Sequence, residues 1–167
     1  MVEGLLASGA RVAASDVDNT NLQRLRELAA TELLLLSSVD VSDQAAMQAW
    51  ANEVKTHFGE VDGVINNAGV ALSCHASDQP REQMEWLFNV NYWGMINGVK
   101  TFLPELMRRP EACIVNISSL FGLLSVPSQS AYNAAKFAVR GYSESLRQDL
   151  RETSIKVVTV HPGGIQT

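Results

Sequence analysis

The chain has 167 residues, 46% of them hydrophobic, and a net charge of −5. This length and composition suit one globular domain with a buried core. The acidic balance argues against a nucleic acid or an anionic membrane as the main partner, and no apolar run approaches the roughly 20 residues that a membrane-spanning helix needs. The start of the chain lacks the basic and apolar regions of a signal peptide, and its cysteines and histidines have no metal-ligand spacing. We therefore expect a cytoplasmic protein with no metal site, in which Cys74 and Cys113 are reduced thiols.

Short apolar runs typical of buried strands alternate along the chain with amphipathic helical patterns. Strands are expected at residues 11–15, 33–39, 63–66, 113–117 and 157–160. Helices are expected at residues 2–8, 19–28, 42–58, 80–104 and 129–150. Because strands that alternate with helices form parallel crossover units, the pattern predicts an α/β layered fold. No repeat, low-complexity tract or linker interrupts it, so residues 1–167 are expected to form a single domain.

Capping and helix-breaking residues predict where several of these helices begin and end. Asn19 or Thr20 can cap the second helix, and Ser42 can cap the third. Gly9 is expected to stop the first helix. Pro104 is expected to kink or end the long fourth helix, because proline removes a backbone donor.

The strand at 113–117 and the helix from residue 129 carry the residues with a recognisable chemistry. Ser118 and Ser119 follow the strand, and Tyr132 and Lys136 lie one turn apart on one helix face. A free tyrosine, with a pKa of about 10, is a poor base at neutral pH, but a neighbouring cation favours its phenolate. A serine hydroxyl can hold the alcohol or carbonyl oxygen while the proton moves. We prefer Ser119 for this role, and we expect Ser118 to form a hydrogen bond at the end of the strand. These groups move a proton but supply no hydride, so a cofactor is implied.

Five motifs occur in the order and approximate spacing of the short-chain dehydrogenase/reductase (SDR) family, which essentially the whole chain resembles. They are Asn66-Asn67-Ala68-Gly69, Asn91, Ser119, Tyr132 with Lys136, and Pro162-Gly163. The resemblance implies a Rossmann-like, doubly wound parallel sheet in three layers that binds NAD(P). It also implies an oxidoreductase that transfers a hydride between NAD(P) and a small-molecule alcohol or ketone.

The same resemblance implies a role for each catalytic residue. Tyr132 would be the general acid/base, and Lys136 would favour its phenolate form and bind the nicotinamide ribose. Ser119 would orient the substrate oxygen. Asn91 would hold a water that links Lys136 to solvent in a proton relay.

Further residues that match the family would bind the cofactor. They are Asp16, Asp40, Val41, Asn67, Ala68, Gly69, Pro162, Gly163, Ile165 and Thr167, together with Tyr132 and Lys136. Asp16 would accept both adenosine ribose hydroxyls, and because its carboxylate repels a 2′-phosphate, NAD is favoured over NADP. Asp40 and Val41 would contact the adenine, although Asp40 and Asp43 can also be loop or capping residues, which is the role we expect for Asp43. Gly69 would allow the backbone to approach the cofactor closely.

Two parts of the family pattern have no counterpart here, namely the first strand with its glycine-rich phosphate loop and the last strand. We therefore expect a partial Rossmann-type domain from a longer dehydrogenase or a truncated reading frame. The missing first strand would lie between the strands ending at Asp16 and Asn66, so either two strand edges stay unpaired or the sheet closes up differently. Because the lost loop supplies most pyrophosphate contacts, residues 1–167 alone are expected to bind NAD weakly and to turn over poorly.

Alternatives to this reading remain open. One is a non-catalytic relic that acts as a binding or dimerisation module, and another is an extended-family NAD-dependent epimerase or dehydratase. By analogy with the family, the helix carrying Gly94 and Gly98 and the helix from residue 129 would form the interface of a homodimer or homotetramer. Residues 70–79 and 120–128 would line the substrate site, which Leu123, Leu124 and Val126 indicate to be apolar.

Overall fold

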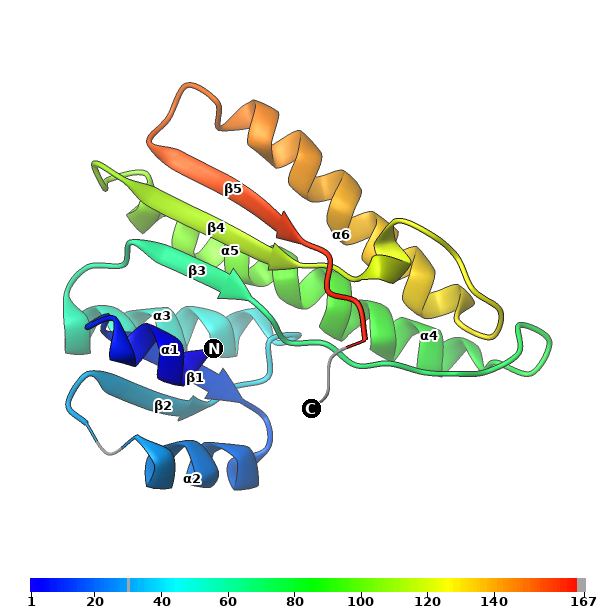
Figure 1. Cartoon of the computed structure of the whole chain (residues 1–167), viewed down its shortest axis with the longest axis horizontal. Helices are drawn as coiled ribbons and strands as arrows, with labels where there is room; N and C mark the ends of the chain where they lie inside the picture. Colours follow the sequence, from blue (N-terminus) through cyan, green and yellow to red (C-terminus); the bar gives the residue numbers. More distant parts are fainter. Residues whose placement is uncertain (30, 165–167) are drawn as a thin grey trace. The chain divides into compact units, whose positions relative to one another are not determined.

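The computed structural model describes residues 1–29 and 31–164. Ile165 and Thr167, two of the predicted cofactor contacts, lie outside these residues. The chain divides into two compact units, residues 1–60 and 61–167, whose elements are drawn in Figure 1. That residues 1–167 behave as a single domain stays a prediction.

The first unit is built around a two-stranded parallel sheet. Its elements are α1 (Val2–Ala7), β1 (Val12–Asp16), α2 (Asn19–Leu28), β2 (Leu34–Ser38) and α3 (Gln44–Phe58). The register places Val12 opposite Leu34. Gly9, with a φ of +83°, follows α1 in the left-handed conformation that commonly ends helices, as predicted. The apolar side chains that are buried in the described part of this unit are Leu22, Val39, Met47 and Val54.

The helices of the first unit are capped one residue away from the predicted positions. Asp18, rather than Asn19 or Thr20, caps α2, because its carboxylate accepts the Thr20 N–H at 2.8 Å. Asp43, rather than Ser42, caps α3 by accepting two backbone N–H groups, which confirms the capping role expected for this aspartate. In both cases the residue just before the first helical turn has the extended backbone that lets its carboxylate reach the N–H groups of that turn.

The second unit contains a three-stranded parallel sheet in the order β3-β4-β5. Its elements are β3 (Gly63–Asn66), α4 (Arg81–Phe88), the π-helical η1 (Asn89–Trp93), α5 (Gly94–Leu106), β4 (Ala112–Ile117), the 3₁₀-helical η2 (Leu120–Gly122), α6 (Ser130–Asp149) and β5 (Ile155–Val160). Residues alternate along β4 between buried and half-buried positions, as expected where one face of a sheet is covered. In Figure 1, α5 and α6 lie behind this sheet. None of the described helices is both long and apolar enough to cross a membrane.

The long helix predicted at 80–104 is present as three consecutive segments, α4, η1 and α5. A π-helical turn contains an extra residue, and such turns occur often at functional sites. Here the turn contains Asn91, one of the predicted catalytic residues. Pro104 lies inside the last turn of α5, and the helix ends at Leu106, two residues beyond the expected end.

The strands form two sheets instead of one. Within the described residues, β1 pairs with β2 alone, and β3 pairs with β4 alone. Each of these two strands therefore has one edge without a strand partner, which agrees with the unpaired-edge alternative. The parallel α/β class is confirmed, and only part of a doubly wound sheet is present.

A chain of polar side chains, of which Asn116 and Ser143 are buried, joins the sheet of the second unit to α6. Asn66 donates to Asn116 at 2.8 Å, and Asn116 donates to the Ser143 hydroxyl at 2.9 Å. A Cβ atom at Gly98 would overlap the Asn66 amide oxygen. Gly98 therefore allows α5 to pack closely against β3 within the unit, and the subunit interface expected on this helix stays a prediction.

Candidate functional site

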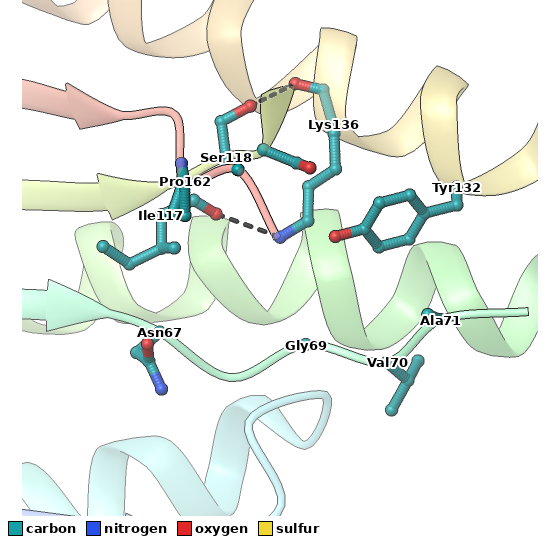
Figure 2. A pocket seen from close by; sticks show the side chains of 11 residues that line it. Asn67, Gly69, Val70, Ala71, Ile117, Ser118, Tyr132, Lys136 and Pro162 are labelled. Carbon is teal, nitrogen blue, oxygen red and sulfur yellow. Dashed lines mark hydrogen bonds between the residues drawn. The ribbon is translucent and has the colours of Figure 1, made fainter. Parts of the chain in front are cut away.

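A cavity of about 270 Å³ lies in the second unit, where β3, β4 and β5 end (Figure 2). Its lining residues are Asn67, Gly69, Val70, Ala71, Ile117, Ser118, Ser119, Tyr132, Lys136, Pro162 and Gly163. Parallel strands bring their carboxyl ends to one edge of a sheet, so segments far apart in sequence meet here. The first turns of α6 complete the wall with Tyr132 and Lys136. The structure thus brings together the predicted catalytic residues Ser119, Tyr132 and Lys136.

Lys136 is buried at the back of this cavity, with 4% of its surface exposed. Its Nζ donates to the main-chain oxygen of Ile117 at 3.0 Å and lies 5.7 Å from the centre of the Tyr132 ring. In Figure 2 the Tyr132 hydroxyl points toward this amine. Burial lowers the pKa of Lys136 from 10.5 to about 8. The amine is therefore still mostly a cation at pH 7 and can stabilise a negative charge on the neighbouring oxygen.

The two serines after β4 differ in their surroundings. Ser118 is 3% exposed, and its hydroxyl donates to the main-chain oxygen of Lys136 at 2.9 Å. Ser119 is half-buried, and its Oγ accepts the Phe121 N–H at 3.1 Å, which caps η2. The Ser119 O–H has no acceptor among the described residues, so it can donate to a ligand in the cavity. This difference agrees with the preference for Ser119 over Ser118.

Asn91 holds the loop that forms one wall of the cavity. Its side chain is buried and uses both of its polar groups on one residue, since Oδ1 accepts the Val70 N–H at 2.7 Å and Nδ2 donates to the Val70 oxygen at 2.8 Å. The Asn91 side-chain amide thus makes the same pair of bonds to the Val70 backbone that the main chain of a neighbouring strand would make. The proton-relay role of Asn91 stays a prediction.

Gly69 lies close to two other side chains of the chain itself. A Cβ atom at this position would lie 3.3 Å from Asn91 Oδ1 and 3.5 Å from Lys136 Nζ. The absence of a side chain at Gly69 therefore leaves room for two predicted catalytic side chains. The sequence did not indicate this reason for a glycine at the position. Ala68 lies between two lining residues without lining the cavity itself.

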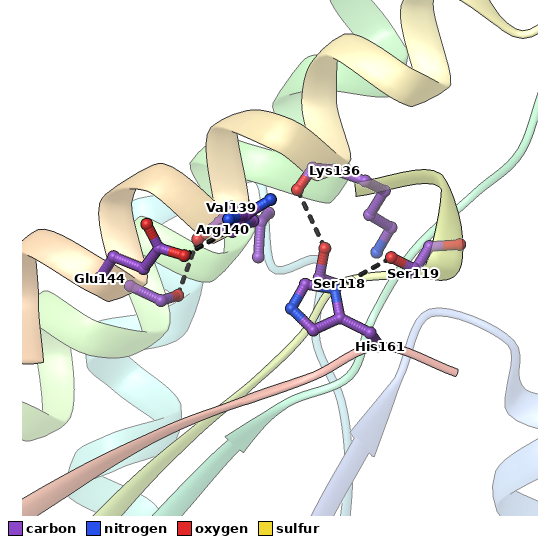
Figure 3. A network of polar contacts seen from close by, with 8 residues as sticks. Ser118, Ser119, Lys136, Val139, Arg140, Glu144 and His161 are labelled. Atoms are coloured by element: carbon purple, nitrogen blue, oxygen red, sulfur yellow. Dashed lines mark hydrogen bonds and ion pairs between the residues drawn. The ribbon is translucent and has the colours of Figure 1, made fainter. Parts of the chain in front are cut away.

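His161, for which the sequence predicted no catalytic or metal-binding role, does not line the cavity but contacts one of its lining residues. Its Nδ1 lies 3.0 Å from the main-chain oxygen of Ser119 (Figure 3). Backbone bonds from Ser118 N–H to Val160 and from Leu120 N–H to Pro162, both 2.8 Å, tie the same two segments together. A lone histidine before a Pro-Gly turn has no informative spacing. The pairing of the two neighbouring strands would have indicated its position, because β4 and β5 are in register up to Val160.

The predicted adenosine contacts lie in the first unit. Asp16 ends β1, where its carboxylate accepts the Asp18 N–H at 2.9 Å and the Asn21 side-chain amide at 3.1 Å. Asp40 Oδ1 accepts both the N–H and the O–H of Ser42, at 2.8 and 2.7 Å, so it has the local loop role that was the alternative for this residue. Val41 follows it and is half-buried.

The parallel strands, the crossover helices and the cavity at the carboxyl edge define a Rossmann-like α/β protein. The family model of the short chain dehydrogenases matches residues 1–167, and the chain belongs to this family of oxidoreductases. The resemblance and the fold class inferred from the motifs are therefore confirmed.

Related proteins agree on the family and are longer than this chain. SadH of Mycobacterium tuberculosis, which is named as an oxidoreductase, is 46% identical over 162 residues, or 95% of this chain and 59% of SadH. An SDR structure from Burkholderia phymatum in complex with NAD has a TM-score of 0.89 and 34% identity, covering 93% of this chain and 57% of that one. A short-chain dehydrogenase from Streptomyces avermitilis has a TM-score of 0.93 and 30% identity, covering 99% and 60%. The chain thus spans less than two thirds of each of these relatives.

Proposed function

We propose that this chain carries the catalytic groups of an NAD-dependent oxidoreductase that interconverts an alcohol and a ketone. The observation that carries the proposal is the convergence of Ser119, Tyr132 and Lys136 on one cavity at the carboxyl edge of a parallel sheet. Membership of the SDR family supports it. A free hydroxyl, a phenol and a buried ammonium are the groups that an alcohol oxygen needs while it loses or gains a proton.

The residues around the cavity suit the reacting end of a dinucleotide together with a small substrate. The volume of about 270 Å³ is slightly below the usual range for ligand sites and too small for a whole dinucleotide. Asn67, Gly69, Pro162 and Gly163 would surround the nicotinamide, and Lys136 would bind its ribose. The relative solved in complex with NAD supports this choice of cofactor.

The contacts proposed for the adenosine half are those that the family resemblance implies. Asp16 would accept the ribose hydroxyls, and Asp40 and Val41 would contact the adenine. A carboxylate at Asp16 disfavours the 2′-phosphate of NADP, so NAD is the expected cofactor.

In the direction of oxidation, Tyr132 acts as a phenolate that takes the proton of the substrate hydroxyl. NAD, when bound, would supply the acceptor for the hydride that leaves the same carbon, so that the alcohol becomes a carbonyl. Ser119 donates its O–H to the substrate oxygen, and the Lys136 cation stabilises the phenolate. In the reverse direction Tyr132 returns the proton to the carbonyl oxygen. Asn91 keeps the Val70 backbone in place on the opposite wall.

The expected homodimer or homotetramer stays a prediction. Large aromatic side chains are exposed on the helices of the predicted interface, namely Trp86 on α4, Trp93 on η1 and Phe137 on α6. Exposed aromatic side chains are enriched at interfaces between subunits, which supports the prediction.

The proposal is tested by replacing Tyr132 with phenylalanine, which removes the proton donor and keeps the ring. The assay uses a chimera in which residues 1–167 replace the matching segment of SadH, with nicotinamide absorbance as the readout over a panel of apolar secondary alcohols and ketones. We expect turnover to fall by roughly 10²- to 10⁴-fold, while NAD affinity changes by less than about threefold.

Tyr142→Phe is the matched control, because Tyr142 is on the same helix but does not line the cavity. It should keep turnover within about twofold of the parent chimera. If Tyr132→Phe retains turnover, or if NAD affinity falls in parallel with it, Tyr132 is not the acid/base. Micromolar NAD binding by residues 1–167 alone, measured by calorimetry, would contradict the expected weak binding.

A further inference from the structure

Two adjacent residues at the end of β4 hold Lys136 at both ends. The Ser118 hydroxyl donates to the Lys136 main-chain oxygen at 2.9 Å, and the Lys136 amine donates to the Ile117 main-chain oxygen at 3.0 Å. Figure 2 draws both bonds between the same two segments. Because one bond fixes the backbone of the lysine and the other fixes its tip, the side chain is constrained over its whole length.

Gly122 packs directly against the first of these bonds. A Cβ atom at this buried glycine would overlap Ser118 Oγ and would lie 2.8 Å from the Lys136 main-chain oxygen. A helix backbone cannot move aside as easily as the end of a flexible side chain. Any side chain here would therefore push α6 away from β4 or break the Ser118 bond.

The Ser118 bond does more than give two polar groups a partner, because it also fixes the position of Lys136 relative to β4. A carbonyl inside an α-helix already accepts an N–H from the next turn, so Lys136 does not need a second donor. Ser118 is 3% exposed, and a buried hydroxyl needs a partner. Its partner is the main-chain oxygen of Lys136, and this bond holds Lys136 opposite the end of β4.

We propose that Ser118 and Gly122 are positioning residues that hold the Lys136 amine inside the cavity, next to Tyr132. The catalytic meaning of this arrangement rests on the function proposed above. The arrangement itself is a property of the folded chain, so it can be measured without a cofactor or a substrate.

Release of Lys136 has a measurable consequence. Burial holds the pKa of its amine at about 8. If the bond from Ser118 is lost, α6 is free to shift, the amine becomes more exposed to water, and its pKa rises toward the ordinary value of about 10.5.

The experiment is a pH titration of the Lys136 amine by NMR in the 167-residue chain, with labelled lysine and with Lys136→Met to assign the signal. In Ser118→Ala we expect the Lys136 pKa to rise by roughly one unit. Ser143→Ala is the matched control, because Ser143 is also buried and its Oγ also donates to a main-chain oxygen of α6, that of Val139, at 2.7 Å. Because Ser143 Oγ also accepts from the buried Asn116 side chain, this variant should weaken the fold at least as much as Ser118→Ala, and it should leave the Lys136 titration unchanged.

Gly122→Ala should displace α6 from β4 more strongly than Ser118→Ala does. Its control is Gly141→Ala, since Gly141 is on α6 and a Cβ atom there would meet no other atom of the described residues. We expect Gly122→Ala to raise the Lys136 pKa by at least as much as Ser118→Ala. If Gly122→Ala does not fold, Ser118→Ala decides. An unchanged titration in folded Ser118→Ala, or an equal shift in Ser143→Ala, overturns the proposal. Failure of the SadH chimera to turn over any alcohol or ketone would bear on the proposed function alone.

Discussion

The two units differ in how completely their sheets are buried. Every residue of β1 is half-buried, and β2 has the same pattern except for an exposed last residue. In β4, by contrast, buried and half-buried residues alternate, and Ile114 is fully buried. A two-stranded sheet is marginal by itself, whereas three strands with a covered face can be stable. The cavity with Tyr132 and Lys136 therefore belongs to the unit with the more complete core.

The largest effect that would test this comparison is a cavity-forming substitution in each sheet. Ile114→Ala should destabilise the second unit by about 2–5 kcal/mol, because a fully buried side chain leaves a void. Leu35→Ala in the half-buried β2 should cost less than about 1.5 kcal/mol. Native-state hydrogen exchange at amides of β4 and β1 measures the two units separately. Equal losses would mean that the units do not differ in this way.

The next effect is a pH dependence of the second unit that comes from Lys136. Its folded-state pKa is about 8, below the unfolded value of about 10.5, so between these values the unfolded chain binds a proton that the folded chain has released. Stability should therefore rise with pH across this window, by up to about 3 kcal/mol, and the full cost of the buried cation is present below pH 8.

Lys136→Met isolates this contribution, because methionine has a similar shape and does not titrate. The variant should be more stable than the parent at pH 7, and the difference should shrink as the pH approaches 10.5. Urea unfolding at a series of pH values measures both trends. A constant difference between variant and parent would show that Lys136 does not titrate in this range.

The smallest effect concerns helix capping. Asp43→Ala should destabilise the first unit by about 1 kcal/mol, because its carboxylate caps α3 with two hydrogen bonds. In the second unit, Gln129 precedes α6 without a side-chain cap, so Gln129→Ala should change stability by only a few tenths of a kcal/mol. Hydrogen exchange in the first turn of each helix gives the comparison. A similar loss at both positions would contradict it.

The differences between prediction and structure have identifiable causes. The strand expected at 63–66 was found as β3 (Gly63–Asn66), since its apolar run and the following polar residues are local signals. The π-helical turn in the long helix was not predicted; it contains Asn91, whose side chain bonds the backbone of Val70, 21 residues away, and such a distant contact leaves no local signal. The position of His161 beside Ser119 likewise depends on how two strands pair.

Local patterns were sufficient to predict the parallel α/β class, the family and the grouping of Tyr132 with Lys136 on one helix face, because periodicity and motif spacing are properties of neighbouring residues. The folded chain decided which serine is buried, what fills the space beside Gly69 and why Gly122 has no side chain. Those features depend on contacts between segments that are distant in the sequence, and no spacing along the chain records how closely two backbones approach.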